Sequence, residues 1–390
     1  MFYLLLPFLL VAFSSLVKRT IKSNRQQATD FGIIITAYKN VHIAEGLVQS
    51  ILKQSYANHH IYLVADQCDV TNFGLQNEQL TLLKPDPPLN LKVKSIIYAV
   101  EQFVRAHDYI IVFDADNLAH PNFLAEINAY VNAGYSAIQG QRTAKNLDTL
   151  MAGADALGEF YKNYVDRYAP YLLGSSAVIS GSGMAIARDL YLAYLNSPEI
   201  EKGKELGKKM LQEDKILQNF ILSSRQRIVY AWDAVLYDEK VSTPNAVETQ
   251  RSRWLYSYFQ NFPNALALIA KGLLGWNWNQ LLFGIITAGL PMFILLGLSG
   301  GAFLVGIFIA PWMALLILMA MFVFVSNIFL TLYLSKAPAP VWNAAKGAPY
   351  FVFKQLTALL KMGNPQKNFK PTEHQHHVTI DELIKPSDKV

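Results

Sequence analysis

The longest uncharged stretch of the chain, residues 281–334, contains no Asp, Glu, Lys or Arg and is mostly apolar. One helix needs about 20 apolar residues to cross a bilayer, so this stretch is too long for one membrane helix and fits two. The turn between them is expected at Ser299-Gly300-Gly301. Trp276 and Trp278 precede the stretch, as aromatic residues do at a membrane interface. We predict two membrane-spanning helices here.

A shorter apolar run, Phe2 to Val17, is followed by basic residues. A cleaved signal peptide carries its positive charges before the apolar run, whereas an anchor with its N-terminus outside carries them on the cytoplasmic side after it. The basic residues after the run are Lys18, Arg19, Lys22 and Arg25, and those after the uncharged stretch are Lys336, Lys346, Lys354 and Lys361. Both clusters predict an integral membrane protein, of the bacterial inner or plasma membrane type, whose main domain is cytoplasmic.

Charge and cysteine content exclude several classes of protein. Charged residues make up only 16% of the chain and apolar residues 52%, which is low in charge for a soluble protein. A net charge of +5 is too modest for a nucleic-acid-binding surface. The single cysteine, Cys68, excludes an internal disulfide and is compatible with a reducing compartment.

Strand and helix patterns alternate between the two apolar segments. The expected strands are 31–37, 61–65, 109–113, 136–140 and 177–179, and the expected helices are 42–54, 91–104, 121–133 and 214–223. Repeated strand–helix–strand units favour an α/β fold with a mostly parallel sheet and helices on both faces. Two further apolar segments, 264–274 and 348–362, are candidate interfacial helices.

Carboxylates follow two of these strands. Asp114 and Asp116 end the apolar strand that starts at Tyr109, and Asp66 ends the strand before it. Ligands bind at the carboxyl ends of strands in open α/β sheets, and two close carboxylates favour a divalent cation with phosphate oxygens. Alternatively, Asp114 and Asp116 only cap the following helix. The first strand ends at Thr36-Ala37-Tyr38, which adds a hydroxyl and an aromatic ring at the same edge.

Three later segments each allow a structural and a functional interpretation. The Ser180-Gly181-Ser182-Gly183 segment is a plain tight turn or a close backbone approach to a ligand. Glu213 and Asp214 open a helix, where the helix dipole favours acids, or supply a general base. Arg253 and Trp254 precede the membrane segment as a lipid-facing collar, or bind a diphosphate and a sugar.

The C-terminal tail from Asn364 is polar and contains His374, His376 and His377. Three histidines so close together are able to bind a metal, but an exposed tail is the favoured interpretation. The predicted organisation is an anchor with basic flank at 1–25, the α/β domain at 30–262, an interfacial helix at 263–278, two membrane helices at 279–335, a second interfacial helix at 336–363 and the tail at 364–390.

Taken together, these motifs resemble the membrane-anchored family 2 inverting glycosyltransferases of GT-A fold, in the branch that includes cellulose and hyaluronan synthases. The matching residues are Ile35-Thr36-Ala37-Tyr38, Asp66, Lys94-Ser95, Asp114-Ala115-Asp116, Gly181-Ser182-Gly183, Glu213-Asp214 and Gln250-Arg251-Ser252-Arg253-Trp254. They extend over about 220 residues in the order of the family, and the Gln-x-x-Arg-Trp element after the Glu-Asp pair is the most specific.

The resemblance implies a role for each matching position. It assigns Asp214, with Glu213 and Arg253, to catalysis; Thr36, Tyr38, Asp66, Lys94, Asp114, Gln250 and Arg251 to the nucleotide-sugar donor; Gly181, Ser182, Gly183 and Trp254 to the acceptor; and Asp116 with Asp114 to Mg2+ or Mn2+. The implied reaction is one in-line displacement at the anomeric carbon, with inversion, in which Asp214 takes the proton of the acceptor hydroxyl.

Two departures from the family pattern affect donor binding. The family motif Pro-Ala-Tyr-Asn-Glu is Thr36-Ala37-Tyr38-Lys39-Asn40 here, and a Gly-Lys-Gly turn is Val93-Lys94-Ser95. The expected function is transfer of a sugar, from a UDP-sugar in the first instance, to a saccharide or lipid-linked acceptor. Alternatives are one subunit of a processive polysaccharide synthase that needs partner membrane subunits, or a catalytically silent membrane scaffold.

Overall fold

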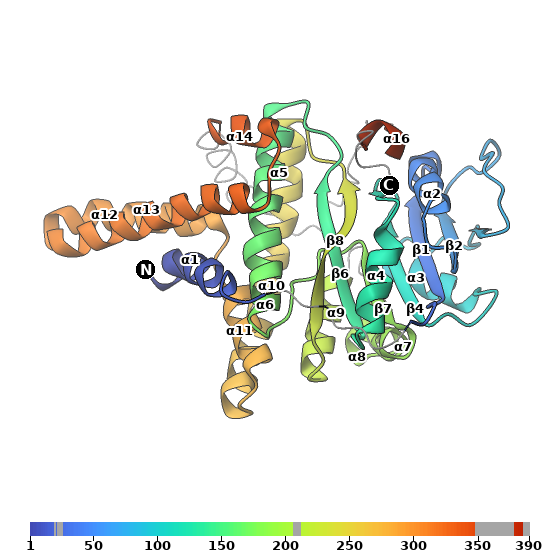
Figure 1. The fold of residues 1–390 in the computed structure, drawn as a ribbon, viewed down its shortest axis with the longest axis horizontal. Helices are drawn as coiled ribbons and strands as arrows, with labels where there is room; N and C mark the ends of the chain where they lie inside the picture. The colour runs from blue at the N-terminus through green and yellow to red at the C-terminus, as the bar shows by residue number, and fades with distance from the viewer. Residues whose placement is uncertain (19–20, 22–25, 206–211, 348–377, 385–390) are drawn as a thin grey trace. The chain divides into compact units, whose positions relative to one another are not determined.

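The strands form one eight-stranded sheet, which contains the predicted strands at 31–37, 61–65, 109–113 and 136–140 (Figure 1). The computed structural model describes residues 1–18, 21, 26–205, 212–347 and 378–384. The strands are β1 (Phe31–Tyr38), β2 (His59–Asp66), β3 (Leu80–Leu83), β4 (Tyr109–Asp114), β5 (Leu118–Ala119), β6 (Ala137–Ala144), β7 (Met184–Ala187) and β8 (Ile228–Asp238). Their order is β3-β2-β1-β4-β7-β6-β8-β5.

The sheet is mixed but mostly parallel, which confirms the predicted α/β fold. Strand β1 pairs in parallel with β2 and β4, β2 with β3, and β6 with β8. Antiparallel pairs join β7 to β4 and β6, and β5 to β8. Strands β1, β2 and β4 are buried along almost their whole length, which explains their continuous apolar sequences.

The chain divides into two compact units, and each is described by itself. The sheet unit comprises Thr20–Asn146, Val178–Glu239 and Pro365–Val390; the helical unit comprises Met1–Arg19, Leu147–Ala177 and Lys240–Asn364. Besides the strands, the sheet unit contains η1 (His42–Ala44), α2 (Glu45–Leu52), α3 (Lys92–Glu101), α4 (Phe123–Asn132), α7 (Arg188–Leu195), α8 (Pro198–Glu205), α9 (Glu213–Ser223) and α16 (Ile380–Leu383).

The predicted strand 177–179 is wrong, because the chain enters the sheet only after the turn at Ser180–Gly183. The Ser180 N–H donates to the Gln139 side chain at 3.0 Å and not to a neighbouring strand. Backbone pairing starts again at Gly183, whose N–H donates to the Val112 carbonyl at 2.9 Å. Strand β7 therefore follows the turn that it was predicted to precede.

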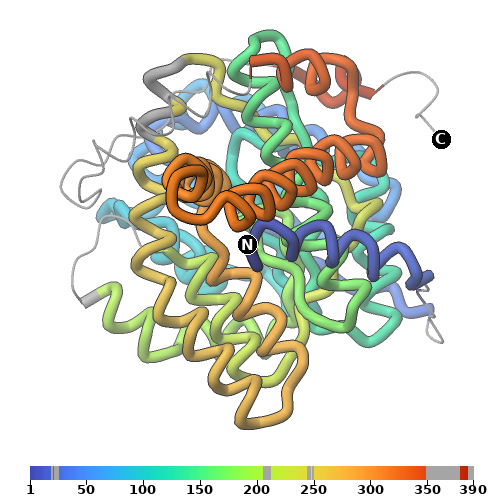
Figure 2. The backbone as a smooth tube through the Cα atoms, turned by 90° about the vertical axis from the view of Figure 1, so that its left-hand side faces the viewer, coloured from blue at the N-terminus to red at the C-terminus, as the bar shows by residue number. Residues whose placement is uncertain are grey.

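The helical unit contains the long apolar helices. Its elements are α1 (Phe2–Ser14), α5 (Leu150–Lys162), the π-helix η2 (Asn163–Tyr168), α6 (Ala169–Leu172), α10 (Pro244–Leu274), α11 (Trp278–Ala288), α12 (Met292–Ile309), α13 (Pro311–Leu334) and α14 (Ala339–Ala345). Helices α12 and α13 pack side by side, and α1 lies against α13 (Figure 2). Helix α10 packs on α11, and α5 on α14.

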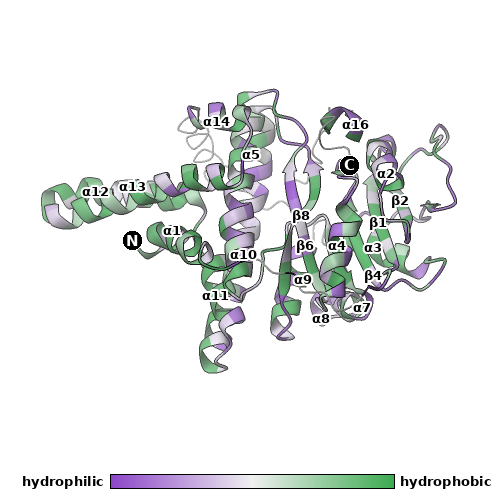
Figure 3. Ribbon diagram, in the orientation of Figure 1, coloured by the Kyte–Doolittle hydropathy of each residue, from purple (hydrophilic) through white to green (hydrophobic). Residues whose placement is uncertain are grey.

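Helices α12 and α13 are each long and apolar enough to cross a membrane (Figure 3). They span 18 and 24 residues, and only 6% and 22% of their most apolar 18-residue windows are buried. The predicted turn at Ser299-Gly300-Gly301 is wrong, because these residues lie inside α12. The helix ends at Ile309, and Pro311 opens α13, where the missing proline N–H is not needed.

Two further predicted apolar segments are helical in the structure. The segment 264–274 is the last part of the 31-residue helix α10, which continues through Pro263; its interfacial position stays a prediction. Helix α1 has 13 residues and is about 20 Å long, against a hydrocarbon core of about 30 Å. The predicted helix 348–362 and the histidines of the tail lie outside the described residues.

Candidate active site

The carboxyl ends of β1, β2 and β4 bring four predicted donor residues to one edge of the sheet. The register aligns Tyr38 with Asp66 and Thr36 with Asp114. Asp66 is 2% exposed. Its two carboxylate oxygens accept the backbone N–H groups of Leu89, at 3.0 Å, and Asn90, at 2.7 Å.

The Asn90 side chain extends this edge. Its Oδ1 accepts the Tyr38 hydroxyl at 3.3 Å and Gln67 Nε2 at 2.6 Å. Tyr38 is 40% exposed, and Lys39 Nζ lies 5.3 Å from the centre of its ring. Asp66 therefore fixes the loop before α3 and, through Asn90, the position of the Tyr38 hydroxyl.

The loop Asp114-Ala115-Asp116 is held by a chain of buried hydrogen bonds. Ser182 Oγ accepts the Asp114 N–H at 3.1 Å and donates to Asn117 Oδ1. Asn117 Nδ2 donates to Asp238 Oδ1 at 3.2 Å and lies 3.5 Å from Asp116 Oδ1. Asp116 is 8% exposed. Ser182, which was predicted to face the acceptor, is fully buried and positions this loop.

Lys92 is a site residue that sequence reasoning missed. Its Nζ lies 2.7 Å from Asp114 Oδ1, 3.2 Å from the Gly181 carbonyl oxygen and 3.5 Å from Glu213 Oε1. The predicted donor residue was Lys94, which lies two residues further along α3 and so about 200° around the helix. The position of Lys92, first in the helix after the loop, is the signal that would have found it.

Charge explains the protonation of this cluster. Burial alone would lower the pKa of the Lys92 ammonium, but the carboxylates of Asp114, Glu213 and Asp214 raise it above its ordinary value. Burial raises the pKa of Glu213, the Lys92 ammonium lowers it in part, and Asp214 raises it further. Lys92 is therefore the charged partner that these acids share.

Glu213 and Asp214 open α9 beside the glycine turn. A Cβ added to Gly181 would lie 3.9 Å from Asp214 Cβ and 4.0 Å from its Oδ2. Gly181 has φ +87°, a left-handed conformation that favours glycine. The Glu213 carbonyl accepts the Tyr194 hydroxyl at 2.8 Å, and Asp214 Oδ2 pairs with Lys215 at 3.4 Å. The sheet unit thus brings Asp114, the turn and the acid pair together around Lys92.

The site offers few protein side chains that could bind a metal ion. Among the described residues, no group of three or more His, Cys, Asp or Glu side chains is arranged to hold a metal ion. Mg2+ and ions like it are commonly held by one or two carboxylates, with substrate phosphates and water completing the shell. Asp116 and Asp114, one residue apart in the loop, fit a cation of that kind.

The Gln-x-x-Arg-Trp element lies in the helical unit, on α10. Arg251 Nη2 donates to Asp155 Oδ1 of α5. The Arg251 guanidinium lies 4.3 Å from the centre of the Trp254 ring, and Lys162 Nζ lies 5.4 Å from it. Two cations therefore contact one indole ring. Asp155 and Lys162 were not predicted, because no motif marks them.

Burial lowers the pKa values of two basic side chains in this unit. Burial, and next the Arg251 guanidinium, lower the pKa of Lys162 to about 8. Burial also lowers the pKa of Arg253. The π-helix η2 adds Arg167, which donates to Glu159 at 2.7 Å and to Asn163 at 2.6 Å. Lys162 and Arg251 are thus two cations on the Trp254 ring, and Asp155 balances the charge of Arg251.

Solved structures of two other proteins are similar to this chain. The mannosyltransferase PcManGT from Pyrobaculum calidifontis, in complex with GDP-Man and Mn2+, is 14% identical with a TM-score of 0.55, covering 92% of this chain and 95% of that chain. S. aureus TarS 1-349 in complex with UDP is also 14% identical, with a TM-score of 0.39, covering 62% of this chain and 65% of that chain. No curated protein matches the sequence. The similarity to PcManGT shows the fold.

A sequence model of one family decides the family membership. It carries the description "Glycosyltransferase like family 2" and matches residues 28–257, which is more than half of the 390-residue chain. The match starts just before β1 and continues past the Gln-x-x-Arg-Trp element in α10. The chain therefore belongs to this family and is a glycosyltransferase.

Proposed function

We propose that the chain is a membrane-bound, inverting, metal-dependent glycosyltransferase that moves a sugar from a nucleotide sugar to a saccharide or lipid-linked acceptor. One observation carries this proposal: Asp114 and Glu213 both contact Lys92, and Asp214 lies beside Gly181 in the same cluster. The donor-side carboxylate and the acid pair thus lie within one charge cluster, as a direct displacement needs.

Asp214 is the proposed general base. Its carboxylate takes the proton of an acceptor hydroxyl, the hydroxyl oxygen forms a bond to the anomeric carbon, and the bond from that carbon to the diphosphate oxygen breaks. The nucleoside diphosphate leaves with the electron pair, and the anomeric configuration inverts. Asp214 suits this role because it borders the Gly181 turn, where the missing side chain leaves room for a substrate.

Thr36, Tyr38 and Asp66 are the proposed contacts to the base and ribose of the donor. Asp116 and Asp114 would hold Mg2+ or Mn2+, which when bound neutralises the diphosphate. Gln250 and Arg253 are proposed to bind the diphosphate. Trp254 is a proposed acceptor contact, and so is Gly181, the partly exposed residue of the Gly181-Ser182-Gly183 segment. The structure of PcManGT contains GDP-Man and Mn2+, so GDP-sugars belong beside UDP-sugars in any donor panel.

The apolar helices support membrane attachment. Most of the surface of α12 and α13 is apolar and exposed, which is unfavourable in water over so large an area. We propose that α12 crosses outward and α13 returns, with the sheet unit in the cytoplasm. Cys68, the single cysteine, is buried, so introduced cysteines can be labelled selectively. Labelling of Ala310→Cys only from outside and Lys336→Cys only from inside tests this topology; the reverse would refute it.

The test of the reaction is release of nucleoside diphosphate. Purified, detergent-solubilised protein is incubated with single UDP- and GDP-sugars, with and without added membrane lipid, in Mn2+ or in EDTA. We expect release from one donor class that depends on the metal. No release with any donor, under any of these conditions, would favour the catalytically silent scaffold, and equal release in EDTA would refute the metal requirement.

A further inference from the structure

The C-terminal segment 378–384 lies against the sheet unit. Ile380 is 2% exposed and Ile384 6%, and both pack on Leu118, which is 1% exposed. Asp381 forms an ion pair with Lys53 from the chain just after α2. These contacts join the end of the chain to an element more than 250 residues earlier in sequence.

Helix α16 is too short to be stable on its own. It has four residues, whereas isolated helices need about 12–15 residues to be even marginal in water. A capping box formed by Thr379 and Glu382 closes its first turn, with the Thr379 N–H donating to Glu382 Oε2 at 3.0 Å. Docking of its isoleucines on the sheet unit therefore stabilises this turn.

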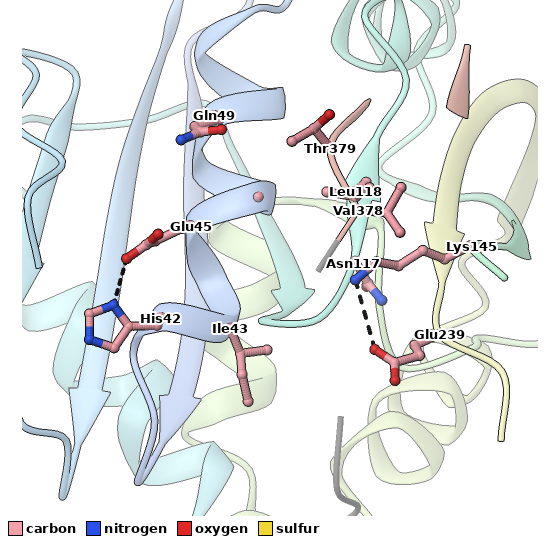
Figure 4. A pocket seen from close by; sticks show the side chains of 11 residues that line it. His42, Ile43, Glu45, Gln49, Asn117, Leu118, Lys145, Glu239, Val378 and Thr379 are labelled. Atoms are coloured by element: carbon pink, nitrogen blue, oxygen red, sulfur yellow. Dashed lines mark hydrogen bonds and ion pairs between the residues drawn. The ribbon is translucent and has the colours of Figure 1, made fainter. Parts of the chain in front are cut away.

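The docked segment borders the loop that carries the two aspartates. Val378 and Thr379 line a pocket together with Asn117, Leu118 and Lys145 (Figure 4). Lys145 Nζ donates to the Asp116 carbonyl at 3.2 Å. The segment 378–384 and Lys145, the backbone partner of Asp116, thus line the same pocket.

A continuous set of contacts leads from the segment 378–384 to Asp114. Ile380 and Ile384 cover Leu118, and Leu118 directly follows Asn117. Asn117 accepts from Ser182 Oγ, which in turn accepts the Asp114 N–H. Leu118 also pairs with Tyr237 of β8, and Tyr237 lies beside the same isoleucines. The segment 378–384 therefore supports β5, the strand that directly follows the aspartate loop.

We propose that residues 378–384 are a positioning segment that docks on β5 and β8 and holds the Asp114-Ala115-Asp116 loop in place. Its buried isoleucines keep Leu118 in β5, and the Lys53–Asp381 pair fixes the orientation of the segment. The importance of this segment for turnover rests on the proposed function, in which Asp114 and Asp116 hold the metal and the donor. Its effect on the position of the loop is independent of the proposed function.

Hydrogen exchange in the full-length protein tests the positioning directly. In Ile380→Asp, amide exchange over Asp114–Ala119 should rise by about tenfold or more, because loss of a buried isoleucine commonly costs at least that factor. Val104→Asp is the matched control, since Val104 is an apolar side chain of the same unit that is 60% exposed. It should leave exchange in the loop unchanged. Unchanged exchange in Ile380→Asp would overturn the proposal.

The ion pair offers a second variant that keeps the fold. Lys53→Asp and Asp381→Lys should each raise exchange in the loop and the Mn2+ concentration needed for half-maximal release, and the double variant should restore both. Failure of the double variant to restore loop exchange would overturn the docking. If the wild-type protein releases no nucleoside diphosphate at all, the proposed function fails, while the exchange result still decides the positioning.

Discussion

Replacement of Gly183 by Ala tests how the turn before β7 is packed. Gly183 has φ +63°, and a Cβ there would lie 2.4 Å from Leu236 Cδ2 and 3.1 Å from its Cδ1. Leu236 is fully buried in β8, and buried side chains are closely packed, so its displacement by an added Cβ should cost stability. Gly181 also has positive φ, but an added Cβ would meet Asp214 only at 3.9 Å, which is an ordinary contact.

The two substitutions therefore share one cost and differ in another. A left-handed conformation costs alanine about 1–2 kcal/mol at either position. Overpacking against Leu236 adds about 1–3 kcal/mol for Gly183→Ala alone. Since about 1 kcal/mol lowers the melting temperature of a domain of 150–250 residues by roughly 2–4 °C, Gly183→Ala should melt about 2–12 °C below Gly181→Ala.

Thermal unfolding of the detergent-solubilised full chain, followed by tryptophan fluorescence, measures this difference. Gly181→Ala should lose less stability but more turnover, because its methyl group points toward Asp214. Equal melting temperatures for the two variants would refute the argument that Leu236 enforces glycine at position 183.

Two further predictions follow from the charges. Lys92→Met removes the cation that lowers the pKa of Glu213, so the Glu213 carboxyl, followed by carboxyl-labelled NMR, should titrate at higher pH in the variant than in the wild type; an unchanged titration would show that Lys92 does not act on Glu213. The pKa of Lys162 is lowered to about 8, below its value of about 10.4 in unfolded chains. The unfolded state then binds more protons between these two values, so stability should rise with pH across this window. Melting curves at pH 7 to 10 should show this rise in the wild type and lose it in Lys162→Met.

Much of the sheet unit was predictable from the sequence. Strands β1, β2 and β4 are buried on both faces, so their apolar sequences are continuous and easy to recognise. Strand β8 was missed, because Asp233 interrupts its apolar pattern. Strand β7 was misplaced, because the apolar residues 177–179 are typical of a strand although they lie outside the strands of the sheet.

The site was predictable only where a motif marks it. Asp114, Asp116 and Asp214 could be proposed because carboxylates after a strand, or at a helix start, have recognisable chemistry, and their roles stay predictions. Lys92 was missed because the family motif pointed to Lys94, although Lys92 stands first in the helix after the loop. Asp155 supports Arg251 from a different helix, and such a tertiary contact has no local signal. The end of α12 was misplaced because Gly300 and Gly301 are tolerated within an apolar helix.

The most direct test of the account is the effect of Asp214→Asn on release of nucleoside diphosphate. Loss of a general base typically costs a factor of about 10²–10⁴, so the variant should lose at least about a hundredfold in turnover with its melting temperature preserved. Asp69→Asn, which changes an exposed carboxylate of the same unit, should keep the wild-type rate. Full activity of Asp214→Asn would contradict the assignment of the base and with it the proposed mechanism.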